Sequence, residues 1–142
     1  MSCTKIRVTV KDRLKEICID EDMTNPHSDK AFMAARRLLQ RILEQYPNKK
    51  VGFFCSNDDI ANLLQRECII RGVNIPEDVE IIGYDNSPIS DYAVYPITSI
   101  SQNIPLMARI AIESLDNYIP HESLVPAMLI NKSTTKSLPE LV

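Results

Sequence analysis

The chain has 142 residues, a formal net charge of −3, 44% hydrophobic residues and 25% charged residues. This length suits one domain, and the balance is that of an ordinary globular protein, which excludes a disordered chain, a collagen-like repeat or a coiled coil. Sixteen Lys and Arg against nineteen Asp and Glu leave no cationic face of the kind that binds phosphates. We therefore expect any contact with DNA to be made by a region outside this chain.

Neither a membrane span nor a leader is predicted. No apolar segment is long enough to cross a bilayer, and the first residues contain no apolar core of a secretion signal. We expect a cytoplasmic protein with no membrane partner.

Four cysteines lie at positions 3, 18, 55 and 68, without a CxxC pair, and the two histidines are distant from them in sequence. This spacing does not predict a zinc site or any other metal site. Cys55 and Cys68 fall in apolar runs, where a thiol behaves as a small buried hydrophobe. We expect reduced, structural cysteines, in agreement with a cytoplasmic protein.

The first fifty residues predict a strand, a loop and a helix. Apolar and polar residues alternate over 6–10, which predicts a strand, and residues 14–19 continue as either a helix or a second short strand. Residues 20–28 are polar and form a loop. Ser28 is a good helix N-cap, and apolar residues at helical spacing follow until Pro47.

The middle of the chain alternates apolar strands with helices. Residues 51–55 form a short apolar run, typical of a strand that is buried on both faces of a parallel sheet. A helix is predicted over 59–71, ended by Gly72, and a second buried strand over 79–84. This alternation predicts an α/β fold with a mostly parallel sheet.

Beyond this unit we predict a loop over 87–96, a strand over 97–100, a helix that begins at Pro105, a linker over 120–126 and a last strand over 127–130. The chain contains three glycines and neither a GxGxxG nor a GxxxxGK[ST] motif, which disfavours a nucleotide phosphate loop.

Polar side chains follow the two buried strands at their carboxyl ends, where open α/β sheets bind ligands. Asn57 and Asp58 follow the first strand, and Asp85 follows the second. Their amide and carboxylate groups can pair with the hydroxyls of a sugar or the polar edge of a base. The same residue types also cap helices and form turns, and that alternative stays open, most of all for Asp58.

No catalytic residue and no cofactor are predicted. The chain has no nucleophile elbow, and both histidines lie in polar loops. A phospho-acceptor site would need a lysine at the end of a strand after Asp85, and none is present. We therefore expect a protein that is not an enzyme.

Four segments resemble, in order and spacing, the LacI/GalR-type transcription regulators: VGFFCSNDDIA over 51–61, RGVNIPEDVEIIGYDN over 71–86, YPITSISQ over 95–102 and LINKST over 129–134. The resemblance covers about residues 51–135, and residues 1–50 fit only loosely. It implies a single domain over 1–142 with a three-layer α/β/α architecture. This would be the C-terminal lobe of a periplasmic-binding-protein-like effector domain, in which a sugar or another small metabolite binds between two lobes.

The resemblance also implies roles for single residues. By position, Asn57 and Asp85 match residues that hydrogen-bond the effector, with Asp58 as a weaker candidate. The family forms dimers through the helix after Asn57 and the loop after Asp85. The residues of a homodimer interface would then be Ile60, Leu63, Leu64, Ile89, Tyr92 and Tyr95. The apolar residues of the loop favour a contact surface on physical grounds as well.

The chain departs from the family pattern at Asn131, where an arginine is usual, and it holds neither the DNA-binding region nor most of the first lobe. We expect it to be part of a longer regulator whose DNA-binding region is of the LacI or the GntR type, and half a cleft to bind effector weakly. The alternatives are a lobe of a transport-type periplasmic sugar-binding protein, and an enzyme or phosphoreceiver that uses Asp58 or Asp85.

Overall fold

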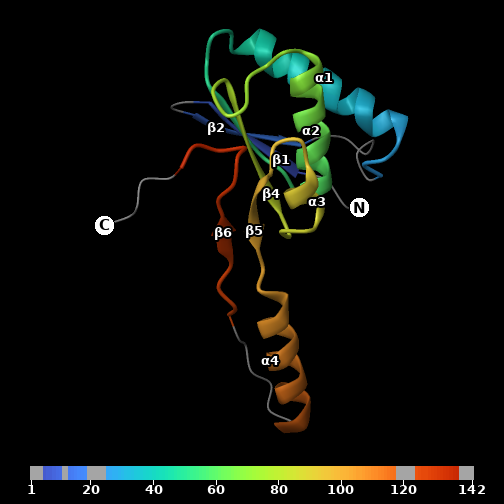
Figure 1. Ribbon diagram of the computed structural model, residues 1–142, viewed down its shortest axis with the longest axis vertical. Helices are drawn as coiled ribbons and strands as arrows, with labels where there is room; N and C mark the ends of the chain where they lie inside the picture. The colour runs from blue at the N-terminus through green and yellow to red at the C-terminus, as the bar shows by residue number, and fades with distance from the viewer. Residues whose placement is uncertain (1–4, 11–12, 19–24, 118–123, 138–142) are drawn as a thin grey trace.

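The computed structural model describes residues 5–10, 13–18, 25–117 and 124–137. Its strands are β1 (Lys5–Val10), β2 (Arg13–Cys18), β3 (Val51–Phe54), β4 (Val79–Tyr84), β5 (Thr98–Ser101) and β6 (Met128–Ile130). Its helices are α1 (Asp29–Gln45), α2 (Asp58–Ile70), α3 (Ile89–Tyr92) and α4 (Ile104–Asn117). All six strands belong to one sheet in the order β2-β1-β3-β4-β5-β6 (Figure 1).

The centre of the sheet is parallel and its edges are antiparallel. β3, β4 and β5 pair in parallel, as predicted for the alternating strands and helices. β1 pairs antiparallel with both β2 and β3, and β6 returns antiparallel along β5. Residues 13–18, for which a helix and a strand were both open, are a strand, because Val10 pairs with Arg13 in a hairpin with β1. The predicted α/β class is confirmed.

Side chains cap helices α1 and α2. Ser28 Oγ accepts a hydrogen bond from the Ala31 amide at 3.2 Å and so begins α1, as predicted. Asn57 Oδ1 accepts from the Ile60 amide at 2.9 Å and begins α2. Gly72, just beyond α2, has the left-handed φ of 68° predicted for it. The short helix α3 lies within the predicted loop over 87–96 and was not expected.

The core lies between the sheet and the layer formed by α1 and α2. These helices pack on each other, and α2 packs on β4. The largest fully buried apolar side chains are Leu39, Ile42, Phe53, Ile60, Leu64, Ile81 and Ile97.

Burial alternates along β3 and β4, with one face buried and the other half-exposed. The prediction that these strands are buried on both faces is therefore wrong. Within the described part of the chain, the second helical layer of a three-layer arrangement is not found.

Helix α4 extends away from the sheet (Figure 1). None of its residues from 104 to 115 is buried, and Leu115 is 79% exposed. The sequence predicts an amphipathic helix with one packed face, but the described residues offer that face no partner. Large apolar side chains that gather on an exposed helix face are typical of a contact surface.

The thiols of Cys55 and Cys68 are buried and free. Burial, and next the charge of Glu67, raise the pKa of the Cys68 thiol to about 12. Burial raises the pKa of Cys55 as well. Both thiols are protonated at neutral pH and inert, which confirms that these two cysteines are structural. Cys3 lies outside the described residues.

Candidate functional site

The carboxyl ends of β3 and β4 lie side by side. Phe54 pairs with Ile82 in the parallel ladder, and the Cys55 amide donates to the Ile82 carbonyl at 2.8 Å. The segments with Asn57 and Asp85 therefore leave the sheet at the same edge. This was predicted from the strand-end rule, by which ligands bind at the carboxyl ends of parallel strands.

Asp85 stands on a turn with an unusual backbone. Its φ is 93° and that of Asn86 is 48°, values that cost of order 1–3 kcal/mol each for residues other than glycine. The Asp85 amide donates to the Ile100 carbonyl at 2.9 Å, and the Asn86 amide donates to Ser99 Oγ at 3.0 Å. These bonds to β5 hold the strained turn. Such strain is common at binding sites.

The Asp85 carboxylate is half-exposed and only partly engaged. Gln102 Nε2 donates to its Oδ1 at 2.5 Å, and no described residue bonds Oδ2. Gln102 follows β5, the third parallel strand, at the same edge of the sheet. The strand-end rule that singled out Asn57 and Asp85 therefore also identifies Gln102, which the sequence analysis missed.

Asn57 combines a structural and an open group. Its Oδ1 caps α2, while its Nδ2 has no hydrogen-bond partner among the described residues. The side chain is half-exposed. Capping therefore takes the acceptor of this amide and leaves its donor available, and the two interpretations of Asn57 are compatible.

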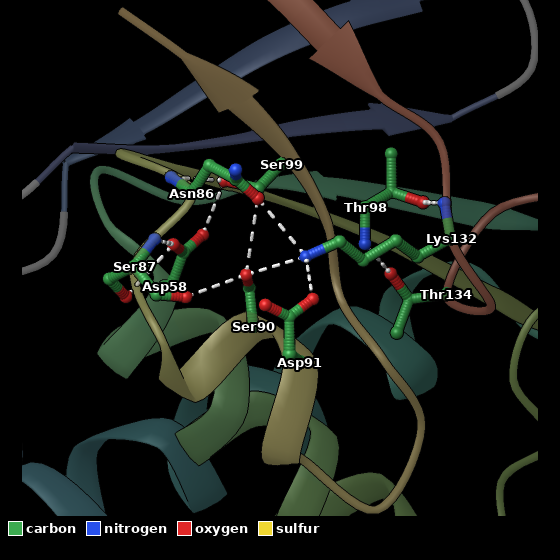
Figure 2. Close-up of polar contacts among 9 residues, drawn as sticks. All are labelled: Asp58, Asn86, Ser87, Ser90, Asp91, Thr98, Ser99, Lys132 and Thr134. Carbon is green, nitrogen blue, oxygen red and sulfur yellow. Dashed lines mark hydrogen bonds and ion pairs between the residues drawn. The ribbon is translucent and has the colours of Figure 1, made fainter. Parts of the chain in front are cut away.

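Asp58 is a structural residue. It is 1% exposed, and its carboxylate accepts three hydrogen bonds (Figure 2). Oδ2 accepts from the Ser87 amide at 2.7 Å and from Ser87 Oγ at 3.0 Å, and Oδ1 accepts from Ser99 Oγ at 2.6 Å. The prediction of Asp58 as a ligand-binding residue is wrong, because its side chain faces inward and joins the start of α2 to the turn after β4.

Gly83 makes room for this carboxylate. A Cβ atom at position 83 would lie 2.1 Å from Asp58 Oδ1 and 3.3 Å from the Asp58 Cα. Only glycine permits this approach of β4 to α2. A glycine inside a strand whose other residues carry large side chains is the signal of a close backbone contact.

A buried threonine fastens the C-terminal segment to the sheet. Thr134 Oγ1 donates to the Ile81 carbonyl at 2.6 Å and accepts from the Thr98 amide at 2.9 Å. The Thr134 carbonyl also accepts from the Ile81 amide at 3.0 Å. Thr134 thus extends the pairing of β4 where β5 has not yet begun, and it places the neighbouring Lys132 against the turn after β4 (Figure 2).

Half of the predicted dimer interface is packed inside the chain. Ile60, Leu63 and Leu64 belong to the hydrophobic core. Their assignment to a dimer interface is wrong, because the apolar face of α2 covers the protein's own sheet. The solvent-facing apolar residues of α2 are Ile69 and Ile70 instead.

The other predicted interface residues surround an exposed apolar patch. Tyr92 is 84% exposed, and Val94 and Tyr95 are exposed as well, whereas Ile89 is half-buried. We call Tyr92, Val94 and Tyr95 the tyrosine surface. The buried Gln65 amide fixes it to α2, because its Nε2 donates to the Tyr95 carbonyl at 2.7 Å and its Oε1 accepts from the Tyr95 amide at 3.1 Å.

Among the described residues, no helix combines the length and apolar character that a membrane crossing requires. Within that same part of the chain, no three His, Cys, Asp or Glu residues are grouped to hold a metal ion. An open concavity of about 500 Å³ lies at the start of α4, lined by Asn103, Pro105, Leu106 and Arg109.

Comparison with known proteins identifies this arrangement. Residues 5–135 match the family described as a periplasmic binding protein-like domain. The chain belongs to this family. The resemblance to the effector domains of LacI-type regulators is thereby confirmed, and so is the periplasmic-binding-protein-like fold, of which the described residues form the sheet and one helical layer.

The relatives of this periplasmic-binding-protein-like domain are transcription repressors. The domain is 33% identical over 132 residues to the HTH-type transcriptional repressor PurR of Vibrio atlanticus. The match covers 87% of this chain and 38% of that protein. The domain is 32% identical over 108 residues to the ribose operon repressor of Bacillus subtilis, with 72% of this chain and 33% of the relative covered. The alternative of a transport receptor is not favoured by these relatives.

Among solved structures, the domain is similar to a LacI family transcriptional regulator from Enterococcus faecium with bound ribose. The identity is 25%, the TM-score is 0.58, and the match covers 76% of this chain and 41% of that one. The chain thus spans about a third to two-fifths of the length of the proteins it matches.

Proposed function

We propose that this chain is one lobe of the effector-sensing domain of a LacI-type transcription regulator, without enzymatic activity and located in the cytoplasm. The effector is a small polar molecule that binds at the sheet edge carrying Asn57 and Asp85. A sugar fits this site better than a planar base does. DNA is contacted by another part of the regulator, in keeping with the acidic balance of this chain.

The observation that carries this proposal is a pair of open polar groups at one edge of the sheet. Asp85 keeps one carboxylate oxygen and Asn57 keeps its amide donor, and no described residue bonds either group. A carboxylate accepts from adjacent sugar hydroxyls and an amide N–H₂ donates to them, so the pair matches a polyol. The relative with bound ribose supports the same choice.

Helix α4 supports the proposal that a second lobe completes the cleft. Its apolar side chains have no cover in the described part of the chain, and the relatives are more than twice as long as the segment they share with it. A single lobe offers an effector contacts on one side only. We therefore expect the chain alone to bind weakly, and the longest natural form of the protein to bind more tightly.

Effector binding should depend on the charge of Asp85. Asparagine keeps the acceptor for Gln102 and tolerates a positive φ, so Asp85→Asn removes the charge at little cost to the turn. Loss of one hydrogen bond to a charged group, about 1.5–3 kcal/mol, should weaken binding by about 10- to 150-fold. NMR titration of the longest natural form with D-ribose, D-glucose and adenine measures this effect.

The matched control is Asp59→Asn, because Asp59 is a half-exposed carboxylate on the first turn of α2 with no described hydrogen bond. Its affinity should equal that of the unmodified protein. The proposed site would be refuted if no probe binds saturably, or if Asp85→Asn binds as tightly as the control.

We further propose that the regulator is a homodimer that pairs through the tyrosine surface. Ile69 lies one helical turn beyond Gln65, which fixes Tyr95, so it extends this surface along α2. Exposed aromatic side chains of this kind are the usual energetic centres of interfaces.

Replacing Tyr92 with glutamate should therefore weaken the dimer by about 2 kcal/mol, or roughly 30-fold in the dissociation constant. Sedimentation equilibrium measures this change. Met33→Glu is the control, because Met33 is also an exposed apolar residue but lies on α1. A dimer that Met33→Glu dissociates and Tyr92→Glu does not would place the interface on α1 and contradict the proposal.

A further inference from the structure

Lys132 is a nearly buried cation beside the turn that carries Asp85. Its side chain is 13% exposed, and its Nζ donates to Asn86 Oδ1 at 3.0 Å, Ser90 Oγ at 2.7 Å and Asp91 Oδ1 at 2.7 Å (Figure 2). An ammonium has three N–H donors, so all of them are used. The acceptors come from two places, the strained turn and the helix α3.

Hydrogen bonds to the sheet fix the backbone from which the Lys132 side chain extends. Its amide donates to Thr98 Oγ1 at 2.8 Å, and the nearby Thr134 is bonded to both β4 and β5. The side chain therefore starts from the rigid part of the sheet.

The partners of the ammonium define what it does. Asn86 follows Asp85 directly, and its left-handed φ of 48° is costly without support. Its side-chain oxygen accepts from Lys132 at 3.0 Å and, more weakly, from Ser90 Oγ at 3.4 Å. Removal of the ammonium leaves the Asn86 side chain with only the weaker of these bonds.

The charge of Lys132 is only partly neutralised. Asp91, its one carboxylate partner among the residues that the structure describes, is 63% exposed, and the other two acceptors are neutral. A cation so placed adds little to stability, because the cost of removing it from water offsets much of its attraction to a solvated carboxylate. Its contribution is instead geometric, since one nitrogen holds three oxygens of two segments at fixed separations.

We propose that Lys132 is a positioning residue of the effector site. It acts through Asn86, holds the turn that orients the Asp85 carboxylate, and joins this turn to α3. The inference rests on the proposed function of Asp85. Lys132 lies in the segment LINKST, to which the sequence analysis assigned no binding role.

The first test follows the turn itself and needs no ligand. Lys132→Met keeps the length and apolar stem of the side chain and removes the ammonium. Lys50→Met is the matched control, because Lys50 is also a half-buried lysine in an ion pair, with Glu80 Oε1 at 2.9 Å, and pairs with β4 far from the turn. Amide hydrogen exchange reports local opening, and urea unfolding reports global stability.

We expect the amides of residues 85–91 to exchange at least tenfold faster in Lys132→Met, with exchange in β3 and β4 unchanged. Lys50→Met should leave residues 85–91 as they are. Unchanged exchange in the turn, or a uniform increase across the chain, overturns the proposal, because a merely stabilising lysine acts on the whole fold. Should Lys132→Met not fold, Asp91→Asn weakens the same anchor at an exposed position and should shift the exchange of the turn in the same direction.

The second test measures D-ribose affinity by NMR titration of the longest natural form. Where the unmodified protein binds ribose, Lys132→Met should bind about tenfold more weakly and Lys50→Met equally well. Equal affinity in Lys132→Met overturns the positioning role. If the unmodified protein does not bind any of the probes used for Asp85, the proposed function fails, while the exchange experiment still decides whether Lys132 holds the turn.

Discussion

Replacement of Gly83 with alanine is expected to destabilise this domain by about 3–5 kcal/mol. The added Cβ would lie 2.1 Å from Asp58 Oδ1, so the carboxylate must leave its place. Its three hydrogen bonds to Ser87 and Ser99 are then broken, and the donors are left in a mostly buried space. Urea unfolding of the variant, followed by circular dichroism, measures the loss.

Gly72→Ala is the control for this substitution. Gly72 has a φ of 68°, and a Cβ there would meet nothing within 4 Å. Alanine then costs only the free energy of adopting this left-handed φ, about 1–2 kcal/mol of stability. Equal losses at the two glycines would show that the steric conflict with Asp58 is not the cause.

The second large effect is expected for Asp58→Ala, a loss of about 3–4 kcal/mol of folding free energy. The substitution removes the acceptor for the Ser87 amide, Ser87 Oγ and Ser99 Oγ. Since Ser99 is itself fully buried, its hydroxyl loses its acceptor at a place remote from bulk water. Asp59→Ala is the comparison, because the adjacent acid lies on the same helical turn without described hydrogen bonds; it should lose less than about 1 kcal/mol.

The two substitutions should also be coupled. With alanine at position 58, the carboxylate that an added Cβ at position 83 would strike is absent. The double variant should therefore lose at least about 1 kcal/mol less than the sum of the single losses. Additive losses would mean that Gly83 and Asp58 act independently, contrary to the geometry.

Much of the fold follows from the sequence where local signals and burial agree. The unit β3-α2-β4 has two apolar strands, an Asn57 cap and a Gly72 terminator, and each of these features is found as predicted. Helix α3 has only four residues after a proline, too few to show a period. The one-sided burial of β3 and β4 is a property of how many helices cover the sheet, which strand composition does not reveal.

Some residues of the candidate site could likewise be predicted from the sequence, and others could not. Position at a strand end was enough to find Asn57 and Asp85, and would have been enough for Gln102. The error at Asp58 was avoidable in part, because Asp58 is three residues before the buried Ala61 and seven before the buried Gln65, on the inward side of α2. The same helical spacing places Leu64 in the core rather than in an interface. The contacts of Lys132 join segments more than forty residues apart, and no local pattern predicts them.

The projecting helix α4 has a consequence for how the protein folds. It has 14 residues, and an isolated helix of that length is marginal in water. We therefore expect the order of α4 to depend on the proposed second lobe, and the folding of the helix and that lobe to be one cooperative reaction. Since α4 is inserted between β5 and β6, the strand pair that leads to Lys132, denaturing the covering surface is expected to loosen this edge of the sheet before the rest of the domain unfolds.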